Sequence, residues 1–376
     1  MLGIALEGIG ASPGKASGPI ARSVSEIAAY DQPCVLVAAD LTPAETALFD
    51  TERVAGIATE RGGLQSHAAI LARSLEVPAV LGVAGLLDAA QGLQYAEVDG
   101  DAGEVLLTAA QPATPPRPTK IMPQSDLHPQ VSATVSSTAE LDRLLTMAPL
   151  RVGLVRSELI APDQLTAFLK KLLSEIPEAW IRLPDLGGDK SSVQDPNPAL
   201  GLRGIRRYRA YPEELERFMR ALGHANSALP VHLLIPMLTN RTEVEPVIET
   251  VRSYLDGRAF KIGAMIETPA AALQAQEFAR LCDFLCIGTT DLAQYVYAAD
   301  RQTPALNAYA HPAAPPLMEL YGRTIQAAND KNISVGVCGM AASDRTVGPF
   351  LLAAGASHLS VPVNELHELS DRLSSL

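Results

Sequence analysis

The pattern of apolar and polar residues in the first part of the chain is that of a small α/β domain. Residues 3–20 mix small, apolar and glycine residues, which predicts a strand, a turn at Pro13 and Gly14, and another strand. Residues 41–50 predict a helix with Pro43 in its first turn. Further strands are predicted for residues 34–38, 54–59, 77–83 and 96–107.

From residue 131 onward, short apolar runs alternate with amphipathic helical segments. Eight such units in roughly 250 residues have the size and rhythm of a (β/α)8 TIM barrel. An open doubly wound sheet is the alternative, although so many strand–helix units are more typical of a barrel. The predicted strands contain the sequences VSATV, VGLVR, AWIRL, VHLLIPM, KIGAMIE, DFLCIG, SVGVCG and SHLSV.

The two patterns are separated by residues 109–129, whose six prolines disfavour regular structure and favour an extended spacer. We therefore expect one domain over residues 1–108, a Pro-rich linker over 109–129 and the barrel over 130–376. A Pro-rich surface loop within a single domain is the alternative.

Composition narrows the class of protein. The chain is 47% hydrophobic and 19% charged, like an ordinary soluble globular protein. A net charge of −12 argues against nonspecific binding to nucleic acid or to anionic membranes. Four cysteines without a CxxC pair argue against a disulfide framework or structural zinc. With no cationic leader and no apolar run of ~20 residues, we expect a cytoplasmic protein.

One histidine stands in a setting suited to phosphate chemistry. Gly62 and Gly63 allow an anion to approach the main chain closely, and Ser66 is a candidate N-cap for a helix. His67 would lie in the first turn of that helix, where N–H groups and the dipole favour anions. An imidazole there could act as a nucleophile. The alternative is that His67 only packs or caps.

Polar side chains follow the predicted barrel strands, where a barrel gathers its site. Several arginines and a lysine suit a doubly anionic ligand, because guanidinium pairs bidentately with phosphate and carboxylate. Two carboxylates from neighbouring strands, Glu267 and Asp291, suit Mg²⁺. The alternative is a structural ion-pair cluster without metal. The strand ends carry Arg156, Glu158, Arg182, Asp185, Lys190, Arg203, Met237, Glu267, Asp291, Gln294, Arg301 and Cys338.

Many short motifs in fixed order resemble the phosphoenolpyruvate-utilising enzymes, and most of all enzyme I of the sugar phosphotransferase system. Residues 60–83 contain GG, SHAAI and EVPAVLGV, and the barrel region contains RSEL, DLGGDK, NPALGLR, IPM, IETPAAA, IGTTDLAQY, ADR and CGM. The resemblance implies a swivelling phosphohistidine domain followed by a phosphoenolpyruvate-binding TIM barrel. It also implies a homodimer formed through the barrel.

The resemblance further implies roles for individual residues. His67 would accept the phosphoryl group, releasing pyruvate, and pass it to an unidentified acceptor. Glu267 and Asp291 would bind Mg²⁺, and Cys338 would be the acid/base at the methylene carbon. The implied substrate-binding residues are Arg156, Arg182, Arg203, Arg301, Lys190 and Thr290.

The chain also departs from the enzyme I pattern. Thr290 replaces an asparagine, Met340 a glutamate, Leu183 a threonine, and Leu64 and Gln65 an Arg-Thr pair. Too few residues separate the early strands to hold the helical subdomain that docks the carrier protein in enzyme I. Two hypotheses follow: a phosphotransferase, or a catalytically impaired sensor of phosphoenolpyruvate or pyruvate. Half of a split synthase is a third, weaker one.

Overall fold

The computed structural model describes residues 3–30, 32–41, 53–63, 66–74, 77–110, 127–147, 151–187, 199–225, 229–255, 257–301, 303–309 and 311–375. The chain divides into two compact units. The first consists of Met1–Pro123 with Asp300–Tyr309, and the second of Gln124–Ala299 with Ala310–Leu376. Apart from Leu41, the predicted helix over 41–50 lies outside the described residues, as does most of the predicted linker.

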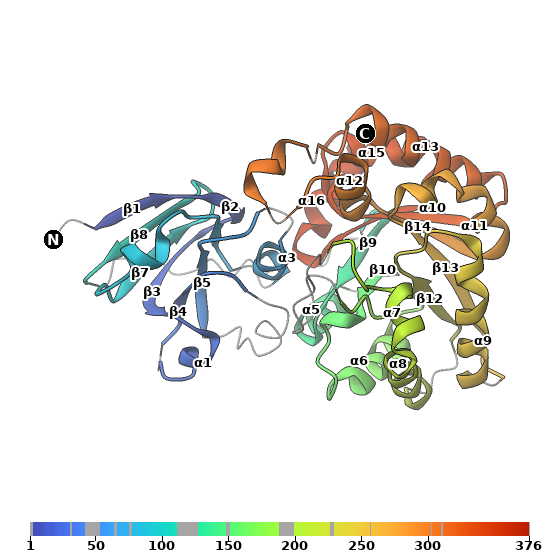
Figure 1. The fold of residues 1–376 in the computed structure, drawn as a ribbon, viewed down its shortest axis with the longest axis horizontal. Coiled ribbons are helices and arrows are strands. Elements are labelled where there is room, and N and C mark those ends of the chain that lie inside the picture. Colours follow the sequence, from blue (N-terminus) through green and yellow to red (C-terminus); the bar gives the residue numbers. More distant parts are fainter. Residues whose placement is uncertain are drawn as a thin grey trace. The chain divides into compact units, whose positions relative to one another are not determined.

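The first unit is built on an eight-stranded mixed sheet with the order β1-β8-β7-β3-β4-β5-β6-β2 (Figure 1). Its strands are β1 (Ile4–Glu7), β2 (Ile9–Ser12), β3 (Lys15–Ala21), β4 (Cys34–Ala38), β5 (Val54–Thr59), β6 (Ala79–Leu81), β7 (Tyr95–Asp99) and β8 (Glu104–Thr108). Its described α-helices are α1 (Val24–Ile27), α3 (His67–Ser74) and α4 (Leu86–Ala89). The predicted α/β class is confirmed.

The first predicted strand is divided in the structure. The strand is interrupted at Gly8. Before this residue, β1 pairs with β8 at one end of the sheet order; after it, β2 pairs with β6 at the other end. A Cβ on Gly8 would lie 2.8 Å from the Leu81 carbonyl oxygen, so only glycine fits at this crossing.

The second unit is a closed barrel of eight parallel strands, which confirms the predicted (β/α)8 fold (Figure 1). Its strands are β9 (Val131–Val135), β10 (Arg151–Arg156), β11 (Glu178–Arg182), β12 (Val231–Ile235), β13 (Phe260–Ile266), β14 (Phe284–Gly288), β15 (Ser334–Cys338) and β16 (His358–Pro362). The ring closes because β16 pairs with β9.

Helices cover the outside of the barrel. They are α5 (Thr138–Leu145), α6 (Leu165–Glu175), α7 (Ile205–Ala210), α8 (Pro212–His224), α9 (Val244–Tyr254), α10 (Pro269–Leu273), α11 (Ala275–Leu281), α12 (Thr289–Tyr297), α13 (Pro315–Asn329), α14 (Met340–Ser343), α15 (Val347–Ala353) and α16 (Leu366–Ser374). None of the described helices is both long and apolar enough to cross a membrane.

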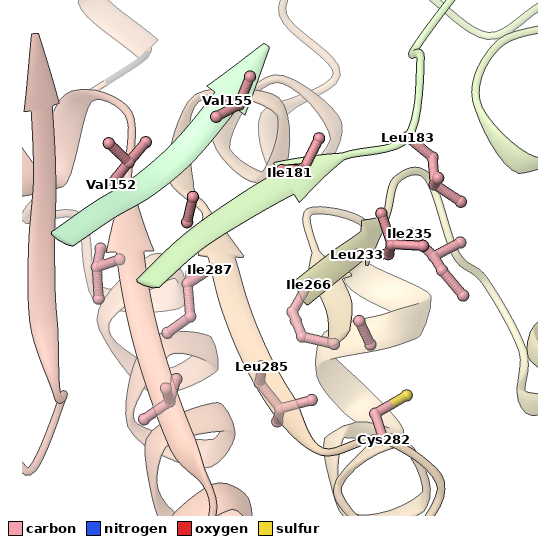
Figure 2. Packing of buried hydrophobic residues seen from close by; sticks show 14 of the residues in the cluster. Val152, Val155, Ile181, Leu183, Leu233, Ile235, Ile266, Cys282, Leu285 and Ile287 are labelled. Carbon is pink, nitrogen blue, oxygen red and sulfur yellow. The ribbon is translucent and has the colours of Figure 1, made fainter. Parts of the chain in front are cut away.

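Alternate residues of the barrel strands face opposite ways, apart from a register shift in β10 between Val152 and Val155, and this separates two cores. The outward residues Val155, Ile181, Leu233 and Ile287 belong to the large core shared with the helices, and Figure 2 shows their packing. The inward residues form a smaller apolar cluster, which we call the barrel floor. It consists of Leu154, Trp180, Leu234, Met265, Phe284, Cys286 and Cys338.

Trp180 is the largest side chain of the barrel floor. It is 1% exposed, and its ring centroid lies 4.2 Å from that of Phe284 and 4.6 Å from that of His358. We expect Trp180→Ala to lower the free energy of barrel unfolding by about 3–5 kcal/mol, because a large cavity would remain. Urea unfolding followed by circular dichroism tests this. Trp180→Phe is the control and should lose less; equal losses would contradict the cavity argument.

Candidate functional site

The interior of the barrel changes from apolar to polar at the carboxyl ends of the strands. Residues two apart on a strand share a face, so each polar residue stands directly above a residue of the interior. The pairs, with the lower residue first, are Leu154 and Arg156, Trp180 and Arg182, Met265 and Glu267, and Gly336 and Cys338. This strand-end region, the barrel mouth, therefore brings together side chains that are far apart in the sequence.

Arg182 is held by carboxyl groups at the barrel mouth. Its Nη2 atom forms an ion pair with Glu158 and lies 3.9 Å from Asp185 Oδ2. Its carbonyl oxygen accepts a hydrogen bond of 2.6 Å from the Ser157 hydroxyl. Burial alone lowers the pKa of Arg182, but Glu158, Asp185 and Glu267 raise it above the ordinary value. The guanidinium group is therefore charged at any working pH.

Arg203 joins two acids that come from different elements. It is 1% exposed. Its Nε and Nη2 atoms donate to the two carboxyl oxygens of Asp185, at 3.3 and 2.6 Å. Its Nη1 atom donates to Asp291 Oδ1 at 3.0 Å and to the Tyr295 hydroxyl at 3.1 Å. Burial alone lowers the pKa of Arg203, whereas Asp185 and Asp291 raise it well above the ordinary value.

Glu267 is fully buried directly after β13. Its Oε1 atom accepts a hydrogen bond of 2.7 Å from the Met237 N–H, and Met237 itself has a left-handed φ of 60°. Its Oε2 atom is buried with no hydrogen-bond partner among the described residues. Burial first, and the charge of Asp291 second, raise the pKa of Glu267 to about 7.

Carboxyl groups outnumber guanidinium groups among the buried, described side chains of this cluster. The acids are Glu158, Asp185, Glu267 and Asp291, and the bases are Arg182 and Arg203. In the sequence, several arginines and a lysine had suggested a site for a doubly anionic ligand. The ionised cluster instead has a deficit of positive charge, which a cation would relieve.

Glu267 and Asp291 fit a divalent cation. No group of three or more His, Cys, Asp or Glu side chains in the described ranges is arranged to hold a metal ion by itself. Two carboxylates suffice for Mg²⁺, however, when substrate oxygens and water complete the octahedron. The unpartnered Glu267 Oε2 atom and the charge balance are consistent with such a site.

Cys338 lies at the end of β15 on the barrel floor and is 2% exposed. Its Sγ atom donates to the Ile287 carbonyl oxygen at 3.5 Å and lies 3.8 Å from Cys286 Sγ. The hydrogen bond to Cys338 and burial raise the pKa of Cys286 well above its ordinary value, so Cys286 stays a neutral thiol. Cys34, Cys282 and Cys286 are also buried.

The turn after Cys338 is tied to the start of α12. The Thr289 hydroxyl donates to the Cys338 carbonyl oxygen at 2.7 Å and accepts from the Ala341 N–H at 3.1 Å. The Thr290 hydroxyl accepts from the Met340 N–H at 3.3 Å. Thr290 and Met340, two departures from the enzyme I pattern, are therefore in contact with each other.

Leu183 does not lie among the polar groups of the mouth. Leu183 stands where the enzyme I pattern has a threonine, next in the sequence to Arg182. The structure instead places Leu183, fully buried, in the outer core, where Figure 2 shows it with Leu233 and Ile235. The reason is alternation: Arg182 points inward, so Leu183 points outward.

The predicted features around His67 are present in the first unit. His67 is the first residue of α3. The Ala69 N–H donates to Ser66 Oγ at 3.3 Å, so Ser66 caps the helix as predicted. Gly62 has a φ of +106°, which favours glycine. The side chain of His67 lies outside the described part of the structure, as do Leu64 and Gln65.

Three other predicted ligand residues have different positions in the structure. Arg156 ends β10 beside Arg182 in the parallel register and is half-buried. Arg301 is half-buried and is grouped with the first unit rather than with the barrel. Lys190 lies outside the described residues.

Two residues of the site were missed from the sequence. Thr289 positions the turn after Cys338, and Tyr295 receives a hydrogen bond from Arg203. Tyr295 lies four residues after Asp291 on α12, and helical spacing puts both on one face. That spacing was the available signal for Tyr295, whereas nothing local pointed to Thr289.

Comparison with known proteins identifies the family. The family model of the PEP-binding domain of PEP-utilising enzymes matches residues 119–376, and that of their mobile domain matches residues 30–103. The chain therefore belongs to the PEP-utilising enzyme family, as the motifs predicted.

Relatives of known name are similar over most of the chain. A phosphoenolpyruvate-protein phosphotransferase of Streptomyces coelicolor is 36% identical over 369 residues, which are 88% of this chain and 65% of the relative. A multiphosphoryl transfer protein of Xanthomonas campestris pv. campestris is 34% identical, over 91% of this chain and 45% of the relative. The chain thus spans less than two thirds of the length of either.

The raised pKa of Glu267 gives a prediction about stability. Its pKa is about 7 in the folded chain, above the ordinary 4.5. The neutral form therefore stabilises the fold below pH 4.5, and this contribution is lost as pH rises through 7. Without divalent cations, Glu267→Gln should raise the unfolding free energy by about 1–3 kcal/mol at pH 8 and change it little at pH 5.

Urea titrations at both pH values, with EDTA present, measure the difference. Glu319→Gln alters an exposed carboxyl and serves as the control, since it should have the same small effect at both pH values. A Glu267→Gln effect that does not grow between pH 5 and pH 8 would contradict the assigned pKa.

Proposed function

We propose that this chain is a phosphotransferase that moves the phosphoryl group of phosphoenolpyruvate to His67, releases pyruvate, and passes the group to a further acceptor. The observation that carries the proposal is the meeting of Arg182, Arg203, Glu267 and Cys338 at one barrel mouth. Membership of the PEP-utilising enzyme family supports it.

The arginines would bind the substrate's anionic groups. Phosphoenolpyruvate carries a phosphate and a carboxylate, and guanidinium pairs with both. Arg182 and Arg203 are already oriented by buried acids, so little side-chain entropy would be lost when the ligand binds. Arg156, Arg301, Lys190 and Thr290 complete the proposed substrate-binding set. A Mg²⁺ ion on Glu267 and Asp291 would neutralise charge on the phosphate oxygens.

Cys338 would supply the proton that completes the reaction. The P–O bond of phosphoenolpyruvate breaks, an N–P bond forms to the imidazole of His67, and the remaining enolate takes a proton at its methylene carbon. The Cys338 thiol, at the end of β15 and part of the barrel floor, would give that proton and become a thiolate.

The wider setting belongs to the same proposal. Four reduced cysteines and the use of phosphoenolpyruvate fit the cytoplasm. A homodimer through the barrel is what the resemblance to enzyme I implies. Leu273, which is 60% exposed in a groove of about 540 Å³ lined by α10, α11 and α13, would offer an apolar contact for it. The acceptor would be a protein or a small molecule able to take phosphate from histidine.

The contact between Thr290 and Met340 favours one alternative, a catalytically impaired sensor. These two residues replace an amide and a carboxyl that the enzyme I pattern has beside the metal aspartate and the cysteine. Their side chains offer fewer polar groups to the transferred phosphate, which would slow transfer more than it weakens ligand binding.

Labelling separates the two functions. Incubation with phosphoenolpyruvate carrying radioactive phosphate, plus Mg²⁺, should leave acid-labile, base-stable label on the chain. His67→Ala should abolish it, since no imidazole remains to form the N–P bond. His311→Ala, which removes an exposed histidine, is the matched control and should keep the label. Binding of phosphoenolpyruvate without label would instead support the sensor.

Proton exchange tests the role of Cys338. We expect Cys338→Ala to slow exchange of the pyruvate methyl protons with D₂O by roughly 10²–10⁴-fold, because the acid/base is lost. Proton NMR of pyruvate with Mg²⁺ and the phosphorylated chain measures the rate. Cys286→Ala removes the neighbouring thiol, 3.8 Å away, and should slow exchange much less. An equal loss of exchange rate in both variants would show that the loss comes from disturbed packing and not from a missing proton donor.

A further inference from the structure

Three sulfur-containing side chains from neighbouring strands lie on the barrel floor. Met265, Cys286 and Cys338 come from β13, β14 and β15 and all belong to the inner apolar cluster. Met265 and Cys286 are partners in the strand register, so their side chains point the same way. The Sγ atoms of Cys286 and Cys338 are 3.8 Å apart. All three side chains are almost fully buried, so water does not compete for their sulfur atoms.

The side chain of Met265 reaches toward the strand that carries Cys338. Gly288 is the register partner of Cys338, and a Cβ placed on Gly288 would lie 2.9 Å from the Met265 Cε atom. The Met265 Sδ atom accepts a weak hydrogen bond of 3.8 Å from Arg182 Nη1. A thioether sulfur has two lone pairs, so one of them remains for a further partner. The thioether is therefore available as a third sulfur ligand beside the two thiols.

The two cysteines are placed for a shared ligand rather than for a bond to each other. Cys286 is opposite Gly336, and Cys338 is opposite Gly288, so the cysteines lie on a diagonal between the strands. Cα atoms on such a diagonal are roughly 7–8 Å apart, whereas a disulfide needs less than about 7 Å. Two sulfurs bound to one ion at about 2.3 Å in a trigonal arrangement are about 4 Å apart. The observed 3.8 Å fits a shared ion.

The chemistry of these ligands selects a soft monovalent cation. Thiolate and thioether sulfurs prefer Cu⁺, which is stable with as few as two or three such ligands. Zn²⁺ prefers four N, O or S ligands in a tetrahedron. Within the described ranges, no three His, Cys, Asp or Glu side chains are arranged for a metal, and the floor around the sulfurs is apolar. Zn²⁺ would therefore lack ligands here, whereas Cu⁺ would not.

We propose that Met265, Cys286 and Cys338 form a binding site for Cu⁺, in which the three sulfur atoms share one ion. Each cysteine gives its thiol proton to the solvent as its sulfur binds, and the thioether binds without losing a proton. Two thiolates and one Cu⁺ leave one excess negative charge. The guanidinium group of Arg182, which contacts the Met265 sulfur, lies close enough to offset this charge.

A bound ion would occupy the sulfur of Cys338, the proton donor of the proposed function. Copper would then stop exchange of the pyruvate methyl protons, while the arginines of the mouth would still be able to bind anions. This consequence rests on the proposed function, whereas the metal site does not. Copper binding and phosphoryl labelling of His67 therefore succeed or fail separately.

Copper titration under anaerobic conditions tests the site without any turnover. Cu⁺ supplied as its acetonitrile complex should bind with a stoichiometry of one ion per chain and give the ultraviolet charge-transfer absorption of copper–thiolate bonds. X-ray absorption of the copper-loaded wild type should show three sulfur neighbours. Nitrogen or oxygen neighbours in place of sulfur would overturn the site. This measurement on the wild type also covers the case in which a variant fails to fold.

Cysteine variants locate the ion. Loss of a partner outside the ligand shell costs about 10–100-fold in metal affinity, so Cys286→Ala, which removes a ligand, should cost more than about 100-fold. Cys282→Ala removes a buried thiol of the outer core and is the matched control, for which we expect an unchanged affinity. Competition with a Cu⁺ chelator measures both affinities. Equal affinities in the two variants would overturn the proposal.

Two further measurements test the ligand set and the choice of ion. Met265→Leu keeps a similar apolar volume but removes the thioether, so it should weaken Cu⁺ binding by less than Cys286→Ala does. An unchanged affinity in Met265→Leu would overturn the three-sulfur site. Zn²⁺ at the same concentration as Cu⁺ should leave the charge-transfer absorption unchanged. Loss of that absorption would show that Zn²⁺ displaces Cu⁺ and would overturn the assignment to a soft monovalent cation.

Discussion

Closing eight parallel strands into a barrel leaves each side chain only two places, the interior or the helix-covered outside. The whole site depends on this constraint. Trp180 and Arg182 share the inner face of β11, whereas Ile181 lies in the outer core. A shift of one residue in the register of β11 would put Arg182 among the helices and remove the largest side chain of the floor. The register of the strands therefore determines which side chains lie at the mouth and so which chemistry the mouth can perform.

The structure also depends on the buried charged groups at the mouth neutralising one another. Removing one member of a buried ion pair leaves the other uncompensated, at a cost of several kcal/mol. Arg203 with Asp185, and Arg182 with Glu158, are both almost fully buried pairs. The binding groups are thus oriented by the fold itself. The same compensation explains why acids are interleaved with arginines along the strand ends.

The sequence predicted the barrel well, because strands buried on both faces are near-continuous apolar runs bounded by polar residues. It predicted the cap Ser66, because capping is a local effect. It failed where contacts are long-range. The charge balance of the mouth and the Thr289 hydrogen bond to the turn after Cys338 depend on elements brought together only by folding. The break at Gly8 also depends on a distant strand edge.

Leu183 shows how a correct motif can mislead about one residue. It follows a strand that carries Arg182, so proximity in sequence suggested proximity in function. In a strand, adjacent residues are the ones that face apart.

The tryptophan beneath Arg182 has a practical consequence. The chain contains a single Trp, and it belongs to the barrel floor. Tryptophan emission, excited at wavelengths that tyrosine does not absorb, therefore originates from the second unit alone, two residues below a guanidinium group of the mouth. Titration of the native chain with small anions can be followed optically without attaching a dye, and any spectral change reports on the barrel rather than on the domain that carries His67.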